Sequence, residues 1–284
     1  MSLLPDLQAW LKSQAFSGSV GLSPIPSGDT SEAFCLTDSG GAKYFVKQKF
    51  SAPPRFFESE AQGLAYLNVS ANVRTPNVLG YGNQFIVMEY IESAPQSSRF
   101  WDDLAEDLAL LHECTREQFG FINDNYCGAT PQLNHFCDDG YEFFAQYRLR
   151  YQADLALASG LLQPNDYRRI INLGQQLNQL IPKQAPALLH GDLWSGNVHV
   201  SAQGGPTFID PAVYYGWRET DLAMTRLFGG FPPRFYQAYA ACTELAPDWE
   251  ERVPIYNLYH LLNHLNLFGE SYYVSVREIL DRFA

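Results

Sequence analysis

Short runs of apolar residues, separated by turn-forming residues, dominate the first 91 positions and predict β-strands. The stretch at residues 38–41 is rich in glycine and polar residues, so it predicts a hairpin between the runs on either side. The predicted strands are residues 33–37, 44–47, 78–79 and 85–88. One segment has helical periodicity instead, because Phe57, Ala61, Leu64 and Leu67 recur on one face of a 3.6-residue turn. The apolar positions Leu7, Trp10 and Leu11 predict a short amphipathic helix before the strands.

Helical spacing prevails after residue 92, and a Ser, Pro and Gln stretch at 92–98 marks the change. The predicted helices are residues 100–113, 141–159, 165–180, 221–228 and 255–268, with short strands at 187–189 and 198–209. We therefore predict an α+β protein of two lobes. Residues 1–91 form a small β-rich lobe with one key helix, and residues 92–284 form a larger, mainly helical lobe.

Charge and composition narrow the possible partners. The net charge is −12, and a nucleic acid or an anionic membrane needs a basic face, so we expect neither as a partner. No apolar run approaches the roughly 18 residues of a membrane span. The five cysteines contain no Cys-x-x-Cys pair, and their number is odd, which favours reduced thiols in the cytoplasm.

The most informative stretch is His190-Gly-Asp-Leu-Trp-Ser-Gly-Asn197, followed by a predicted hairpin and then by Asp210. Because a hairpin brings its outer ends together, we expect Asn197 and Asp210 to lie side by side, with Asp192 one loop away. An amide oxygen and one carboxylate can hold Mg²⁺, while the other carboxylate accepts a proton from a hydroxyl. The spacing matches a kinase catalytic loop, with His-Gly-Asp and Asp-Pro-Ala in place of His-Arg-Asp and Asp-Phe-Gly. The alternative interpretation is an ordinary hairpin flanked by turn formers.

The first lobe tests this interpretation independently. A kinase needs a strand lysine on the nucleotide phosphates, held by a glutamate of the following helix. Lys47 ends a predicted strand, and Glu60 lies on or beside the apolar face of the next helix, where a carboxylate needs a partner. We predict that these two residues pair. The alternative is a surface lysine and an unrelated glutamate.

Two further segments are placed where a kinase binds its nucleotide. Gly28 and Asp29 belong to a stretch located where a phosphate-covering loop is expected, although it has a single glycine. Met88, Glu89 and Ile91 follow a strand where a hinge would present backbone groups to adenine. Met88 would then be a gatekeeper; the alternative for it is a core strand residue.

With these motifs the chain resembles the fructosamine kinase/ketosamine-3-kinase family, in the aminoglycoside-phosphotransferase-like branch of the protein-kinase fold. The resemblance is densest over residues 186–270. Trp194, following the catalytic aspartate, separates this family from aminoglycoside and choline kinases. The segments that carry the resemblance are residues 190–197, 210–216, 219–223, 227–231 and 258–269, with weaker matches at 27–29 and 57–60.

The resemblance implies ATP-dependent phosphorylation of the 3-hydroxyl of a sugar joined to an amine as a ketosamine, free or protein-bound. Asp192 would be the base, and Asn197 and Asp210 would hold Mg²⁺. Lys47, fixed by Glu60, would orient the ATP phosphates, while Asp221 and His190 would support the catalytic loop. Kinases of another hydroxyl acceptor, or a nucleotide-binding pseudokinase, are the alternatives. We expect a monomer or a weak homodimer.

Substrate contacts are expected from aromatic and polar residues of the second lobe. Trp194 offers a flat face to the sugar, and His264 approaches the same cleft. Trp217 either lines the acceptor pocket or packs a loop, and Glu219 is a further candidate for the substrate. His260 and His264 are four residues apart, but no third ligand is evident in the sequence, so we expect a hydrogen-bonded helix histidine at 260 and no zinc.

Overall fold

The computed structural model describes residues 3–14, 21–26, 31–71 and 73–284. The chain divides into two compact units. The first contains residues 1–100 together with 199–210, and the second contains residues 101–198 and 211–284. The first unit thus extends beyond the predicted linker at 92–98, and it also includes the hairpin that the two-lobe prediction assigned to the second part.

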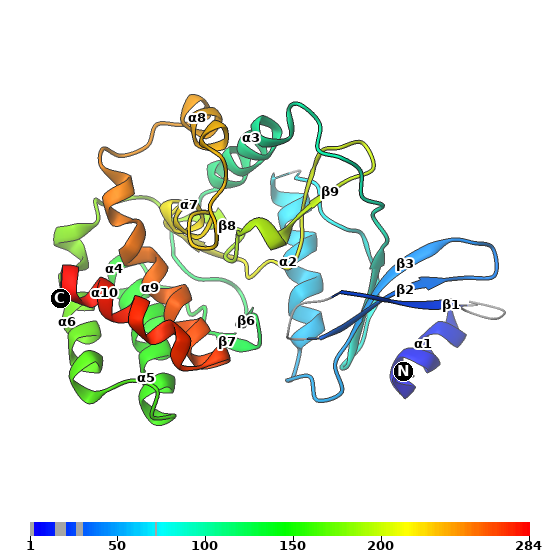
Figure 1. Ribbon diagram of the computed structural model, residues 1–284, viewed down its shortest axis with the longest axis horizontal. Helices are drawn as coiled ribbons and strands as arrows, with labels where there is room; N and C mark the ends of the chain where they lie inside the picture. Colours follow the sequence, from blue (N-terminus) through cyan, green and yellow to red (C-terminus); the bar gives the residue numbers. More distant parts are fainter. Residues whose placement is uncertain (1–2, 15–20, 27–30, 72) are drawn as a thin grey trace. The chain divides into compact units, whose positions relative to one another are not determined.

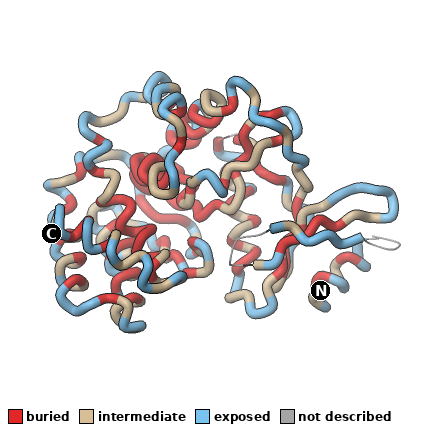
Figure 2. The backbone as a smooth tube through the Cα atoms, in the orientation of Figure 1, coloured by how far each residue is buried: buried red, intermediate tan, exposed pale blue. Residues whose placement is uncertain are grey.

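An antiparallel sheet of five described strands forms the centre of the first unit, in the order β1-β2-β3-β5-β4. Figure 1 labels the first three of these strands. The strands are β1 (Gly21–Ile25), β2 (Glu32–Thr37), β3 (Lys43–Gln48), β4 (Val78–Tyr81) and β5 (Phe85–Glu89). The turn between β2 and β3 is exposed (Figure 2). The four strands and the hairpin predicted from the sequence are therefore confirmed.

Two helices accompany this sheet, α1 (Pro5–Ser13) and α2 (Phe56–Ala71). Leu7 and Leu11 of α1 pack with Leu36, Val46 and Val87 in one apolar cluster. Successive side chains of a strand point to opposite faces, so Lys47 of β3 points away from this cluster. The four periodic residues that predicted α2 are all buried, which confirms that helix.

The hairpin β9 (Val198–Val200) and β10 (Pro206–Phe208) forms its own two-stranded sheet. Backbone hydrogen bonds tie it to the rest of the first unit. The Ser97 N–H donates to the Gly204 carbonyl at 2.9 Å, and the Phe208 N–H donates to the Arg74 carbonyl at 2.9 Å. These bonds explain why residues 199–210 belong to the first unit although they are distant from it in sequence.

The second unit is mainly helical, with short strands between the helices (Figure 1). Its helices are α3 (Phe100–Glu113), α4 (Gly140–Phe144), a π-helix (Ala145–Arg150), α5 (Tyr151–Ala158), α6 (Pro164–Leu180), α7 (Glu219–Met224), α8 (Pro233–Cys242), α9 (Trp249–Phe268) and α10 (Tyr273–Phe283). Its antiparallel strand pairs are β6 (Asn125–Cys127) with β7 (Thr130–Gln132), and β8 (Ala187–Leu189) with β11 (Tyr214–Gly216). The 3₁₀ turns lie at Ser195–Asn197 and Glu270–Tyr272.

The π-helix between α4 and α5 contributes Arg148 to the core of the second unit. Its side chain is fully buried, and its guanidinium carbon lies 4.0 Å from the Tyr214 ring centre and 4.7 Å from that of Phe143. The guanidinium also donates to the Leu133 carbonyl at 2.6 Å and to Asn134 Oδ1 at 2.7 Å. Aromatic faces and oxygen acceptors together stabilise this buried cation in the absence of a carboxylate partner among the described residues.

In the described part of the chain, no helix combines the length and the apolar composition needed to cross a bilayer.

Candidate functional site

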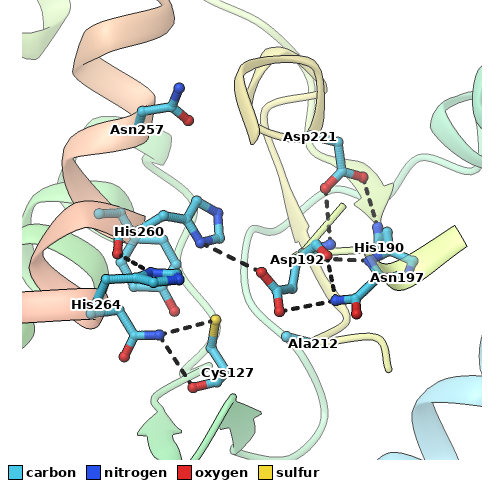
Figure 3. Close-up of polar contacts among 12 residues, drawn as sticks. Cys127, His190, Asp192, Asn197, Ala212, Asp221, Asn257, His260 and His264 are labelled. Carbon is cyan, nitrogen blue, oxygen red and sulfur yellow. Dashed lines mark hydrogen bonds and ion pairs between the residues drawn. The ribbon is translucent and has the colours of Figure 1, made fainter. Parts of the chain in front are cut away.

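The catalytic-loop sequence lies directly after β8, and Asp221 of α7 anchors its backbone. Asp221 accepts hydrogen bonds from the N–H of His190 at 2.7 Å and from the N–H of Gly191 at 2.9 Å (Figure 3). His112 Nε2 lies 3.2 Å from the same carboxylate. Burial opposes ionisation, but the bonds from His112 and the Gly191 N–H outweigh it and lower the pKa of Asp221.

Gly191 is required at its position in this loop. Its φ is +83°, in the left-handed region that favours glycine. A Cβ added there would lie 2.0 Å from the Ala212 carbonyl oxygen. The imidazole of His190, which is fully buried, accepts the Asp192 N–H at 3.3 Å through Nδ1. The loop backbone is thus fixed from His190 to Asp192.

Asp192 and Asn197 are in direct contact within the second unit. Asn197 Nδ2 donates to the Asp192 backbone oxygen at 2.8 Å and to Asp192 Oδ2 at 3.1 Å (Figure 3). These bonds engage the nitrogen of the amide and do not use its oxygen, which is the atom of an asparagine that can bind a metal ion. The Asp192 side chain is 16% exposed, which leaves the carboxylate accessible to a substrate.

In the first unit, Lys47, Glu60 and Asp210 form one charged cluster. Lys47 Nζ donates to Glu60 Oε1 at 2.7 Å and also to Asp210 Oδ1. Burial alone would lower the pKa of Lys47, but the carboxylates of Asp210 and Glu60 raise it, so the lysine is charged. The predicted pairing of Lys47 with Glu60 is therefore present. Asp210 has a φ of +53°, an uncommon backbone for a residue other than glycine.

Of the predicted hinge residues, Met88 and Glu89 are the last two of β5, and Ile91 follows the strand. Met88 is buried opposite Phe45 of β3, as in its alternative interpretation as a core residue. The Glu89 carboxylate binds Arg74 and accepts the Asn77 N–H at 3.2 Å, so its side chain has a structural partner. The Ile91 carbonyl lies 3.0 Å from His199 Nε2, and because a carbonyl can only accept, that nitrogen carries the proton. Gly28 and Asp29 lie outside the described residues.

An aromatic cluster follows the catalytic loop in the second unit. The Trp194 ring centre lies 5.9 Å from that of Phe228, which lies 4.8 Å from the ring of His264. His264 also contacts Phe268 at 5.4 Å and Tyr272 at 5.1 Å. These five rings, the aromatic wall, are all at least partly exposed. The structure therefore places the two predicted substrate residues Trp194 and His264 in one cluster.

The substrate contact predicted for Glu219 needs correction, and for Trp217 the alternative interpretation as a packing residue holds, because both side chains are buried. Trp217 is 3% exposed and packs against Phe119 at 5.9 Å and Tyr141 at 5.3 Å, so it is a packing residue. Glu219 is 1% exposed, and its carboxylate accepts two hydrogen bonds from Arg252 at 2.8 Å. Such a buried pair leaves Glu219 no surface for a substrate.

Sequence reasoning also missed the contacts of three residues. In the first unit, His199 binds the carbonyl of Ile91, one of the predicted hinge residues, and no local pattern indicated it. His260 was expected to be hydrogen-bonded, but neither of its ring nitrogens has a hydrogen-bond partner among the described residues. Cys127 lies beside Asp192 and His260, with one potential ligand atom from each within 4.8 Å of the other two. The sole sequence signal for His260 was its four-residue spacing from His264. That spacing paired His260 with His264, whereas the structure groups His260 with Cys127 and Asp192.

Comparison with solved structures defines the class to which this arrangement belongs. An aminoglycoside phosphotransferase with bound ADP aligns over 98% of this chain and 97% of its own, with a TM-score of 0.63 at 17% identity. A likeness at that identity establishes the fold alone. A candidate fructosamine-3-kinase from Thermobifida fusca aligns over 98% of both chains with a TM-score of 0.87 at 30% identity. The protein thus has the fold of the small-molecule kinases, as predicted.

The sequence comparisons then identify the family. A family model described as fructosamine kinase matches residues 7–284, and the chain belongs to that family. A protein of Enterococcus faecium named as a probable ketoamine kinase is 40% identical over 98% of this chain and 100% of its own. The protein-ribulosamine 3-kinase of Oryza sativa subsp. indica, described as chloroplastic, is 33% identical over 98% of this chain and 83% of its own.

Proposed function

We propose that this protein transfers the γ-phosphoryl group of ATP to the 3-hydroxyl of a ketosamine, carried by a free amine or by a protein. Membership of the fructosamine kinase family and the names of the relatives support this substrate class. The observation that carries the proposal is the partly exposed Asp192 carboxylate, held by Asn197 on a loop that Asp221 anchors.

In this reaction Asp192 acts as the general base and accepts one proton. The 3-hydroxyl oxygen forms a bond to the γ-phosphorus, the bond from that phosphorus to the bridging oxygen breaks, and ADP leaves. Asp192 accepts the hydroxyl proton as the new bond forms. The contact with Asn197 Nδ2 and the anchored backbone limit how far the carboxylate can rotate, so part of the entropic cost of orientation is met before substrate binds.

Lys47 has the role of orienting the nucleotide phosphates. Its ammonium is already charged and held by Glu60, so it presents fixed donors to phosphate oxygens. Asp210 and Asn197 would hold Mg²⁺ through carboxylate and amide oxygens, the ligands that this ion prefers, while the Asn197 amide nitrogen is engaged by Asp192. Bound Mg²⁺ would neutralise charge on the phosphates. The nucleotide would also meet the backbone of the predicted hinge at Glu89 and Ile91, and the segment of the sequence that contains Gly28 and Asp29.

The aromatic wall would bind the acceptor, the ketosamine. Trp194 offers a ring face to the sugar, and His264 continues the wall toward Phe268 and Tyr272. Burial lowers the pKa of His264, so this imidazole is neutral at physiological pH and does not repel a cationic amine. We place the activity in the cytoplasm and expect a monomer or a weak homodimer.

The test is an acceptor comparison with purified protein and Mg-ATP. Fructosyl-lysine and ribulosyl-lysine are compared with choline and an aminoglycoside, with ADP release and ³¹P NMR as readouts. We expect phosphate on the sugar of the ketosamines alone. Transfer only to choline or the aminoglycoside would establish the other kinase interpretation, and ATP binding without transfer to any acceptor would establish a pseudokinase.

Two variants separate the roles within the site. Asp192→Asn removes the proton acceptor but keeps the size of the side chain, so transfer is lost while ATP binding remains. Asp210→Asn weakens ATP binding when Mg²⁺ is present. Asp138→Asn, at an exposed position elsewhere in the second unit, is the control and keeps full activity. Undiminished turnover in Asp192→Asn would refute its role as base.

A further inference from the structure

Three potential metal ligands of different chemistry meet at Asp192, all within the second unit (Figure 3). Cys127 ends β6, Asp192 lies in the loop after β8, and His260 lies within α9. Their ligand atoms all lie within 4.8 Å of one another, and His260 Nδ1 is 3.9 Å from Asp192 Oδ1. The catalytic site described above has no use for Cys127 or His260.

His260 is buried without hydrogen bonds. Its ring is fully buried, and neither nitrogen has a hydrogen-bond partner among the described residues. The 3.9 Å separation from Asp192 is too long for a hydrogen bond. Leaving a buried polar group unpaired is unfavourable, because its hydrogen bonds to water are lost and not replaced. His112 of the same unit, in contrast, binds the Tyr239 hydroxyl at 2.7 Å and Asp221 at 3.2 Å.

The protonation state of His260 suits a metal ligand. Burial, with a smaller contribution from His264, lowers the pKa of His260 to about 3. The imidazole is therefore neutral, and a nitrogen lone pair is available on the ring. Its Nδ1 faces the Asp192 carboxylate in Figure 3. A metal ion between the two groups would satisfy both.

Cys127 is held in position as the third donor. Asn263 Nδ2 lies 3.4 Å from its sulfur and 3.2 Å from its backbone oxygen. The residue is 1% exposed, and burial raises the pKa of its thiol well above the usual range. The sulfur therefore carries a proton, and a metal–sulfur bond forms only as that proton is released to solvent.

One sulfur, one imidazole nitrogen and one carboxylate are a donor set for Zn²⁺. Mg²⁺ prefers oxygen ligands, so this cluster does not compete for the proposed cofactor. At Zn–ligand distances of about 2.0–2.3 Å, the ligand atoms of a tetrahedral site lie roughly 3.3–3.8 Å apart. Closing the cluster onto zinc therefore needs movements of about 1 Å or less. The exposed side of Asp192 gives an entry path and a fourth position for water.

We propose that Cys127, Asp192 and His260 bind Zn²⁺, and that the bound ion inhibits the kinase by withdrawing Asp192 from the acceptor hydroxyl. The binding site stands on the contacts of these three residues alone. The inhibition rests on the proposed function, because it requires Asp192 to be the base.

Metal binding is tested first, without any activity measurement. Co²⁺ is added to chelator-treated protein, and the near-ultraviolet absorption of a thiolate–Co²⁺ bond is recorded. Zn²⁺ affinity is measured by competition with a coloured chelator. Wild-type protein should bind one equivalent and show the thiolate band. Cys127→Ser should lose the band and bind Zn²⁺ about 100-fold more weakly or worse, whereas the exposed thiol variant Cys242→Ser should match wild type.

Inhibition is tested second, with a ketosamine acceptor and Mg-ATP. Zn²⁺ should inhibit wild type and Cys242→Ser, and Cys127→Ser should keep its basal activity and resist the ion. Cys127→Ala is a second variant in case a buried hydroxyl impairs folding, which is monitored by circular dichroism. A missing thiolate band in wild type, or an unchanged band in both Cys127 variants, would overturn the site. Binding without inhibition would overturn its effect on Asp192. A wild-type band in a protein that phosphorylates no acceptor would leave the zinc site standing and reject the proposed function.

Discussion

Replacing Glu219 by glutamine tests whether this residue stabilises the fold or contacts the substrate. Glu219 is 1% exposed, and its carboxylate accepts bonds from Arg252 Nε and Nη2, each at 2.8 Å, and from the Tyr256 hydroxyl at 2.9 Å. Glu219→Gln keeps the volume but removes the negative charge. The Arg252 guanidinium, whose residue is 8% exposed, then remains buried without its counter-ion.

The expected loss of stability follows from this geometry. Removing one partner of a buried, hydrogen-bonded ion pair costs about 3–5 kcal/mol, because the remaining charge is neither paired nor solvated. In a protein of this size, 1 kcal/mol lowers the melting temperature by roughly 2 °C, so the variant should melt about 6–10 °C below wild type. The double variant with Arg252→Met should recover part of the loss, because it removes the uncompensated charge.

The assay combines urea and thermal unfolding with acceptor kinetics at a temperature where every variant is folded. Glu250→Gln is the control, because Glu250 lies in the same α9 as Arg252 and pairs with Arg226 while its side chain is 58% exposed. That change should cost less than about 1 kcal/mol. Unchanged stability in Glu219→Gln together with a raised KM for the acceptor would refute the buried-pair account and restore Glu219 as a substrate residue.

Three further predictions concern single positions. Lys47→Met should lower kcat/KM for ATP by about 100-fold through loss of a preorganised charge, whereas Lys49→Met should match wild type in the same steady-state assay; equal losses would contradict the assignment. Gly191→Ala should lower the free energy of unfolding by about 3 kcal/mol or more, because it adds a clash with the Ala212 carbonyl to the strain of a positive φ. Gly160 has a φ of +73° and open space around it, so Gly160→Ala should lower it by about 1–2 kcal/mol in urea unfolding. A similar loss at both positions would show that the clash is absent. Burial lowers the pKa of His260 to about 3, so between about pH 6.5 and pH 3 the unfolded chain takes up a proton that the native state does not. The free energy of unfolding should therefore decrease as the pH is lowered through this range, and His260→Asn should reduce that slope by up to about 1.4 kcal/mol per pH unit in metal-free buffer. An unchanged slope would mean that His260 is protonated in the native state.

Residues whose positions follow from local periodicity were predictable from the sequence. The helical spacing in α2 placed Glu60 next to the apolar face, and burial there demanded the cation that Lys47 provides. Asn197 contacts Asp192 five residues away, within one loop, so the motif itself brought them close. Such contacts depend on one element, or on two that are adjacent in sequence.

Other features depend on packing between distant elements and left no local signal. The edge strand β1 was missed because its residues are largely exposed and include Pro24, which a strand tolerates only at a sheet edge. The burial of Glu219 depends on Arg252 and Tyr256 of α9, and Cys127 meets His260 only after β6 and α9 have packed. Glu219 was therefore predicted to contact the substrate, although its partners are residues of a distant helix.

The hairpin at residues 199–210 has a consequence for biosynthesis. The polypeptide passes between the two units at three points, after residues 100, 198 and 210, so the first unit is not a continuous segment. A ribosome that has released only the first hundred residues has not yet made Asp210, the partner of Lys47, or the strands that bond to Arg74 and Ser97. The amino-terminal unit therefore stays incomplete, without its hairpin and without Asp210, until most of the second unit has emerged, and a chaperone that protects nascent chains would meet it in this state.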